Sequence, residues 1–276
     1  MKIDSHQHFW RYNQADYGWI GEQEQVLKRD FLPSDLAPIL SSNQLDACVA
    51  VQARQSDSET QWLIELANDN SFIKAVVGWI DIAADTLSEQ LAQYASHPVL
   101  KGFRHVIQDE PDANFMLRPE FIRGLKVLAK HDYCYDLLIF AKQLPQAIEL
   151  VKSIPELPIV VDHIAKPEIA ADIGFAQWQT YMQQIADCPN TMCKVSGMVT
   201  EADHQNWQAE DFQKYLAAVF DAFGPQRIMF GSDWPVCLLA AEYSQVKAIV
   251  EDFVKTNYPQ QFAAIFGGNA QTFYRI

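Results

Sequence analysis

Two histidines near the N-terminus could act together in chemistry, because they stand two residues apart in the run Asp4-Ser5-His6-Gln7-His8. We predict that this run is a strand, in which side chains alternate between the two faces. His6 and His8 then point to the same side, with Asp4 in line behind them. Two imidazoles on one face at the end of a strand can share a metal ion. The same spacing also fits a pair of hydrogen-bonded core histidines, so the pair by itself leaves both interpretations open.

A carboxylate ends an apolar stretch near the C-terminus, in Gly231-Ser232-Asp233-Trp234-Pro235. A carboxylate in that position needs a partner or a chemical task, because burying an unpaired charge is costly. Asp233 could take a proton from water as a general base, with a pKa set by its neighbours. A purely structural role is the alternative. The chain has no Gly-x-Ser-x-Gly motif and no setting for a reactive cysteine, which favours hydrolysis by water over a covalent acyl-enzyme.

The reacting carbonyl would need a positive partner, and the sequence offers two kinds. One is a single divalent ion, Zn²⁺ or Mn²⁺, which lowers the pKa of a bound water or polarises a carbonyl. Its candidate ligands are His6, His8, His163 and Asp233. The other kind needs no metal, because Arg104, His105 and the imidazoles could stabilise an oxyanion directly.

Eight apolar runs, each followed by a stretch with helical character, would position these residues. We predict strands at 4–8, 46–52, 73–80, 99–105, 133–139, 158–163, 191–197 and 227–233. Continuous rather than alternating hydrophobicity indicates strands buried on both faces, as in parallel sheets. Eight β/α units predict an α/β fold in which residues 1–276 form one single-domain (β/α)8 TIM barrel. Asp162 precedes His163 by one residue, so it should face the helices.

In such a barrel the active site lies at the carboxyl ends of the strands. The strand ends and the loops that follow them are rich in His, Asp, Arg and Trp. The candidates for catalysis are Asp233, Arg104 and His105. The candidates for substrate binding are Arg54, Trp79, Asp136, Lys166 and Trp234.

Several of these candidates also have a structural interpretation. Arg104 and Asp136 could form a buried ion pair that only closes the mouth of the barrel. His105 could be a hydrogen-bonded core histidine, and Lys166 could simply be solvated. The loop of residues 9–33 carries Trp10, Tyr12, Tyr17 and Trp19 and is long for a connector, which favours a segment that covers the active site. An ordered surface flap is the alternative for this loop.

Charge and cysteine content exclude several classes of protein. The 276 residues carry a net charge of −14, which disfavours binding to nucleic acid or to anionic membranes. The five cysteines form no Cys-x-x-Cys pair, and no apolar run is long enough to span a bilayer. We therefore expect a reduced, soluble, cytoplasmic protein with a small-molecule substrate. The sequence leaves the oligomeric state open.

The combination of motifs resembles the amidohydrolase superfamily over essentially the whole chain. The matching pieces are Asp4 to His8, His163, Asp233 and the ending from Phe266 to Tyr274. Within the superfamily, the runs Gly102 to His105, Gln108 to Pro111, Val161 to Pro167 and Lys194 to Met198 resemble the lactonase branch. That branch includes L-fuconolactonase, L-rhamnonolactonase and 2-pyrone-4,6-dicarboxylate lactonase.

The resemblance implies a lactonase that opens a sugar-derived (aldono) lactone to its acid with water activated by Asp233. It also implies one divalent ion or none, because the strand with Arg104 and His105 and the strand with Asp136 lack the bridging lysine or glutamate and the histidine of two-metal members. A metal-dependent decarboxylase of the same superfamily is the alternative enzyme. A non-catalytic barrel used for binding is the alternative outside enzymes.

Overall fold

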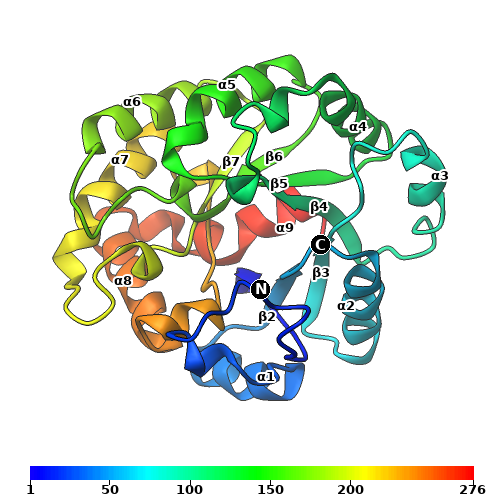
Figure 1. The fold of residues 1–276 in the computed structure, drawn as a ribbon. Coiled ribbons are helices and arrows are strands. Elements are labelled where there is room, and N and C mark those ends of the chain that lie inside the picture. Colours follow the sequence, from blue (N-terminus) through cyan, green and yellow to red (C-terminus); the bar gives the residue numbers. More distant parts are fainter.

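The eight parallel strands follow one another around a barrel in the computed structural model, which describes residues 1–276 (Figure 1). The strands are β1 (Ile3–Gln7), β2 (Ala47–Val51), β3 (Ile73–Gly78), β4 (Leu100–Val106), β5 (Cys134–Leu138), β6 (Ile159–Val161), β7 (Thr191–Val195) and β8 (Ile228–Phe230). The predicted (β/α)8 TIM barrel is confirmed. The amide of Asp233 donates to the carbonyl of His6 at 2.8 Å, and the amide of His8 donates to that of Trp234 at 2.7 Å. These bonds close the barrel between its first and last strands.

Helices surround the barrel on its outside and lie between consecutive strands (Figure 1). They are α1 (Pro33–Ser42), α2 (Asp57–Asp69), α3 (Leu87–Ala92), α4 (Pro119–Lys130), α5 (Leu144–Ser153), α6 (Phe175–Ala186), α7 (Gln213–Phe223) and α8 (Tyr243–Asn257). A ninth helix, α9 (Asn269–Tyr274), ends the chain. None of them is long and apolar enough to cross a membrane.

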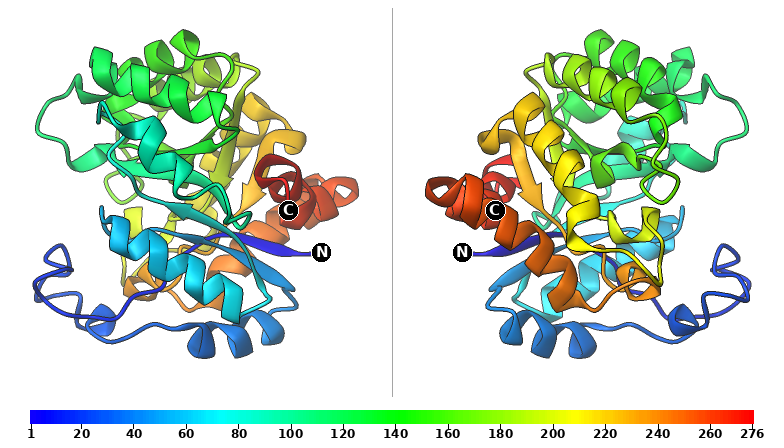
Figure 2. Two further views of the ribbon diagram at one scale, coloured as in Figure 1. Left: turned by 90° about the vertical axis from the view of Figure 1, so that its right-hand side faces the viewer. Right: turned by 90° about the vertical axis from the view of Figure 1, so that its left-hand side faces the viewer.

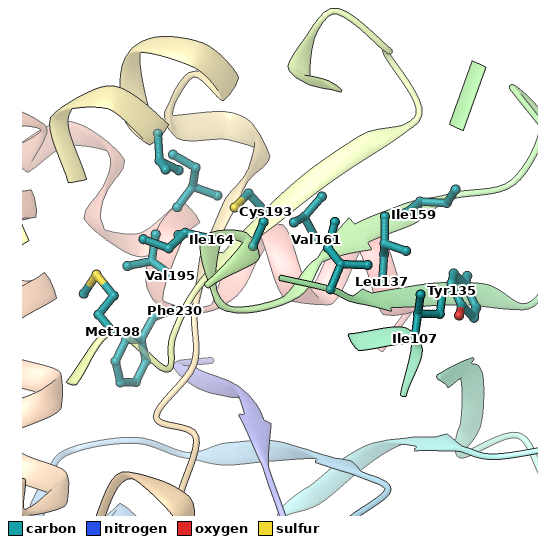
Figure 3. Close-up of a cluster of buried hydrophobic side chains, with 14 of the residues drawn as sticks. Ile107, Tyr135, Leu137, Ile159, Val161, Ile164, Cys193, Val195, Met198 and Phe230 are labelled. Atoms are coloured by element: carbon teal, nitrogen blue, oxygen red, sulfur yellow. The ribbon is translucent and has the colours of Figure 1, made fainter. Parts of the chain in front are cut away.

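Apolar side chains form two separate layers, as the two-residue period of a strand requires. Outward-facing residues pack against the helices, and Figure 3 shows this layer along β5, β6 and β7, with Leu137, Val161 and Val195 among its members. Twelve other buried residues, among them Val49 and Val77, form a smaller cluster inside the barrel. Each such side chain contributes about 1.5–3 kcal/mol by leaving water.

Helix α9 closes the amino-terminal end of the barrel. Its residues Ala270, Phe273 and Tyr274 belong to the interior cluster, so the helix fills the barrel from below. Figure 2 shows this red helix and both chain termini at one end of the barrel, and the blue segment after β1 at the other end. The floor and the mouth of the barrel are thus built from opposite ends of the chain.

The segment between β1 and α1 is anchored by its own aromatic residues and by one carboxylate. Trp10 and Phe31 exchange backbone hydrogen bonds of 3.0 and 2.9 Å, and both side chains are fully buried. The hydroxyl of Tyr17 donates to Glu59 at 3.2 Å, and Glu59 also accepts the amides of Ala53 and Arg54 at 2.9 Å each. Glu59 therefore ties this segment to the loop that follows β2.

Candidate active site

A cavity of about 580 Å³ opens at the carboxyl ends of the strands. Six of the residues expected from the sequence line it: His8, Arg54, Arg104, His163, Lys166 and Asp233. The wall also includes Trp10, Trp19, Ala53, Gln55, Val106, Gln108, Asp109, Glu110, Leu138 and Val236. Trp10 and Trp19 come from the aromatic segment after β1, so that segment contributes to the wall of the cavity.

Asp233 lies where three imidazoles converge. Its Oδ1 is 3.3 Å from Nε2 of His8, 3.8 Å from Nε2 of His163 and 3.9 Å from Nε2 of His6. Burial alone would raise the pKa of this carboxyl, but His163 and the hydrogen bond with His8 outweigh it and hold the pKa below its ordinary value. Asp233 is therefore ionised at neutral pH.

The backbone fixes the imidazoles so that one nitrogen of each faces Asp233. Nδ1 of His8 donates to the carbonyl of Val51 at 2.8 Å, which directs Nε2 toward Asp233. Nδ1 of His163 forms a 2.8 Å hydrogen bond with the hydroxyl of Ser196. Burial lowers the pKa of His163 well below its ordinary value, although the charge of Asp233 opposes this shift.

Two glycines make room for the imidazoles. A Cβ on Gly197 would lie 2.6 Å from Nδ1 of His163, and one on Gly231 would lie 2.6 Å from Cβ of His6. Gly197 also has a φ of +63°, which favours glycine over other residues. The rings can pack against the backbone of β7 and β8 only because these positions have no side chain.

His6 lies deeper than the other two imidazoles and is held by charged groups on both sides. Nη1 of Arg104 donates to Nε2 of His6 at 3.1 Å and to Asp162 at 3.2 Å. Because a guanidinium only donates, Nε2 of His6 accepts from Arg104, and Nδ1 lies between Asp162 at 3.3 Å and the ammonium of Lys194 at 3.1 Å. Burial raises the pKa of Asp162, but Lys194 and His6 outweigh burial and hold that pKa well below its usual value.

The expectation that Asp162 faces the helices is wrong. Strand β6 ends at Val161, and the four residues 163–166 all have positive φ between 47° and 59°. Val160 belongs to the interior cluster and Val161 to the outer layer, so the alternation of the strand itself directs Asp162 into the barrel. The left-handed turn then lets His163 point into the barrel as well. Such a run of left-handed residues is strained and is typical of functional loops.

The expectation that Asp4 lies behind His6 and His8 is wrong as well. The register between β1 and β2 shifts between Asp4 and Gln7, so the strand contains a bulge. The carboxylate of Asp4 accepts hydrogen bonds from Ser232 and from Tyr243 of α8. Asp4 therefore ties β1 to β8 and α8 instead of supporting the imidazoles.

A buried network below the cavity was not predicted from the sequence. Nζ of Lys194 contacts the carboxylate of Asp136 and lies 3.1 Å from both Asp162 and Nδ1 of His6. The hydroxyl of Tyr274 donates to Asp136 as well. Asp136 is thus a partner of Lys194 beneath the cavity and does not line it, and Arg104 pairs with Asp162 instead. A lysine within an apolar strand was the signal that could have shown this network.

Three other expected site residues also lie outside the cavity wall. His105 follows Arg104 in β4, so it points away from the barrel interior and stacks on Phe115 at 4.8 Å. Nε1 of Trp79 donates to Nδ1 of His105 at 3.4 Å. Trp234 is 1% exposed and packs edge-on against Phe31. We therefore assign none of the three a direct contact with substrate.

The donor set around Asp233 fits one divalent ion. One ligand atom each of His6, His163 and Asp233 lies within 4.8 Å of the other two. The hydrogen bonds at Nδ1 of His8 and of His163 are the outer contacts that orient ligating histidines. For His6 to serve as a ligand through Nε2, Arg104 would have to release this atom.

A second ion does not fit the network below. His6, Asp136 and Asp162 also lie within 4.8 Å of one another. The ammonium of Lys194 contacts both carboxylates and so supplies the positive charge that a cation would bring. The residues present therefore favour a centre for one metal ion at most.

The barrel and its strand-end cluster of imidazoles and one carboxylate define an α/β-barrel hydrolase that uses water as the nucleophile. Residues 3–276 match the model of the amidohydrolase family, Amidohydro_2. The chain belongs to this family, as the motifs of the sequence indicated.

Two curated relatives match the full chain. L-fucono-1,5-lactonase of Burkholderia multivorans is 44% identical over 286 residues, which cover 100% of this chain and 96% of that protein. L-fucono-1,5-lactonase of Burkholderia ambifaria is 35% identical over 284 residues, with 100% and 96% covered. The crystal structure of an amidohydrolase from Burkholderia multivorans with bound zinc has a TM-score of 0.97 and 43% identity, and 100% of this chain and 99% of that chain are covered.

Proposed function

We propose that this protein is a lactonase that opens a sugar-derived lactone to its acid. The observation that carries the proposal is the ionised Asp233, which faces three imidazoles at the end of the cavity. The two full-length relatives named L-fucono-1,5-lactonase support the same reaction. We further propose a six-membered 1,5-lactone of a sugar acid as the substrate, by likeness to these relatives.

In the proposed reaction Asp233 takes a proton from a water molecule, and the water oxygen attacks the lactone carbonyl. The bond between the carbonyl carbon and the ring oxygen then breaks. Asp233 returns the proton to the departing ring oxygen, so that a hydroxy acid is formed and the carboxylate is regenerated. One carboxylate serves as base and then as acid, which requires that it remain ionised between turnovers.

Positive groups in the cavity would bind the oxygen atoms of the substrate. Arg104 is 4% exposed and presents its guanidinium to the cavity, where it can donate to the developing oxyanion. Lys166 and Arg54 line the mouth and would bind hydroxyl or ring oxygens. Trp10 and Trp19 offer aromatic surface for the apolar face of the sugar ring.

One divalent ion would be held by His6, His163 and Asp233, with His8 beside them. When bound, such an ion would polarise the lactone carbonyl or lower the pKa of the attacking water. The orientation of His8 and His163 by Val51 and Ser196 serves either a metal ion or the carbonyl oxygen. The role of Asp233 in moving the proton is the same in both cases.

The setting of the enzyme follows from its charge and its cysteines. All five cysteines are buried free thiols, which supports a reducing compartment such as the cytoplasm. The net charge of −14 supports a small-molecule substrate and no nucleic-acid or membrane partner.

The variant Asp233→Asn tests the proposal, because it keeps the shape of the side chain and removes the base. We expect kcat for a 1,5-lactone of a sugar acid to fall by about 10²–10⁴-fold. Asp252→Asn, an exposed carboxylate on α8, is the matched control and should keep the wild-type rate. An Asp233→Asn enzyme with wild-type kcat would remove Asp233 from the chemistry.

A further inference from the structure

Glu110 enters the cavity from the segment that follows β4 and is held there by His105. Its Oε1 lies 2.6 Å from Nε2 of His105, and its side chain is 21% exposed. Glu110 lines the cavity, whereas His105 does not. The histidine therefore reaches the substrate only through this carboxylate.

The proton of His105 is fixed by its neighbours. Nε1 of Trp79 can only donate, and it points at Nδ1 of His105, so Nδ1 accepts and the ring proton is on Nε2. That proton is donated to Glu110. Phe115 stacks on the imidazole with an interplanar angle of 17°, and Phe121 meets it edge-on at 5.7 Å. The ring cannot turn, so the position of Glu110 is fixed before any substrate binds.

We propose that Glu110 binds a ring hydroxyl of the lactone and that His105 and Trp79 are positioning residues for it. This inference rests on the proposed lactonase activity. A carboxylate only accepts hydrogen bonds, and His105 occupies Oε1, so Oε2 is the atom that accepts the O–H of the substrate. Asp109 adds a second negative charge to the same wall. The site therefore selects polyhydroxylated lactones over lactones without hydroxyl groups.

The test compares two six-membered lactones, an aldono-1,5-lactone and δ-valerolactone, which has no hydroxyl group. We expect Glu110→Ala to lower kcat/KM for the aldonolactone by about 10- to 100-fold, the range for a hydrogen bond to a charged group. The value for δ-valerolactone should change by less than about threefold on the same reasoning.

Variants of His105 separate positioning from a merely structural role. His105→Ala should shift the ratio of the two kcat/KM values in the same direction as Glu110→Ala. The double variant His105→Ala/Glu110→Ala should have the same ratio as Glu110→Ala alone. His105→Gln keeps an N–H donor for Glu110 and should retain most of the wild-type ratio.

Two results would overturn the inference. One is a loss in Glu110→Ala that is equal for both lactones, and the other is an effect of His105→Ala that multiplies with that of Glu110→Ala. A wild-type enzyme that hydrolyses neither lactone would overturn the lactonase proposal itself, and the inference with it.

Discussion

Replacing Lys194 by methionine should destabilise the barrel strongly at neutral pH and less strongly at acid pH. Lys194 and its partners Asp136 and Asp162 are all fully buried. Removing one partner of a buried ion pair typically costs about 3–5 kcal/mol, because the other charge is left unpaired. A methionine keeps the length of the side chain, so the loss of charge dominates over the loss of packing.

The pH dependence can be worked out from Asp136. Burial, which outweighs Lys194, raises the pKa of Asp136 to about 6 from 3.8, so ionisation of this group already costs about 3 kcal/mol in the folded protein. Without Lys194 the pKa of Asp136 rises further. The free-energy cost of burying Asp136 at pH 7.5 then reaches at most about 5 kcal/mol, because Asp136 can stay protonated in the folded protein. Asp136 therefore adds about 2 kcal/mol of destabilisation at pH 7.5 and almost none at pH 5.5.

Urea denaturation of wild type and Lys194→Met at pH 7.5 and pH 5.5 measures both numbers. The double variant Asp136→Asn/Lys194→Met removes both charges. Its unfolding free energy should be about 2 kcal/mol higher than that of Lys194→Met at pH 7.5, and its loss relative to wild type should be the same at both pH values. Lys152→Met, an exposed lysine, is the control and should leave the midpoint unchanged. A Lys194→Met loss below about 1 kcal/mol, or a loss equal at both pH values, would refute the reasoning.

Three further predictions concern single side chains. Burial raises the pKa of Glu59 to about 7 from 4.5, so stability contributed by this group falls as pH rises through that window. In Glu59→Gln the decrease in unfolding free energy between pH 5 and pH 8 should be smaller than in wild type by up to about 3 kcal/mol, measured by urea denaturation. The same decrease in both proteins would contradict this prediction. Tyr274→Phe removes a hydroxyl bonded to Asp136 and should lower the unfolding free energy by about 1–3 kcal/mol; an unchanged urea midpoint would count against the network. Trp19 is 46% exposed on the cavity wall, so Trp19→Ala should raise KM for the lactone without changing the melting temperature, and an unchanged KM would exclude it from binding.

The fold was predictable because the signals that specify it repeat along the chain. Each apolar run is short and continuous, and eight of them with helices between them leave a closed barrel as the natural arrangement. His8, His163 and Asp233 could be brought together on the same basis, since parallel strands in a barrel all end at one rim. The structure places Nε2 of His8 and Nε2 of His163 at 3.3 and 3.8 Å from Oδ1 of Asp233.

The positions that could not be predicted are those where a strand departs from its regular period. A bulge in β1 turns Asp4 outward, and the left-handed turn after β6 lets His163 point inward next to Asp162, against the regular alternation of the strand. Neither irregularity has a signature in residue types. Strand alternation alone could have separated Arg104 from His105, but the sequence does not show which of the two neighbours faces the barrel interior.

The partners of Lys194 could not be predicted from the sequence either, because they come from distant segments of the chain. Lys194 is isolated in an apolar strand, which indicates a buried partner but not which one. Its partners come from β5, from the turn after β6 and from β1, and Tyr274 joins Asp136 from the last helix. Only the closed barrel brings these segments together.

The central claim is that the chain is a lactonase that uses Asp233 as its base. The most direct measurement is acid release from a panel of aldonolactones in a pH-stat, with the wild-type protein before and after thorough chelation and after addition of Zn²⁺ or Mn²⁺. We predict hydrolysis of a 1,5-lactone in at least one metal condition; survival after chelation would assign the imidazoles to the substrate, and loss restored by metal would assign them to one ion. No acid release from any lactone under any condition, with CO₂ release from an aromatic acid instead, would contradict the account and favour a decarboxylase.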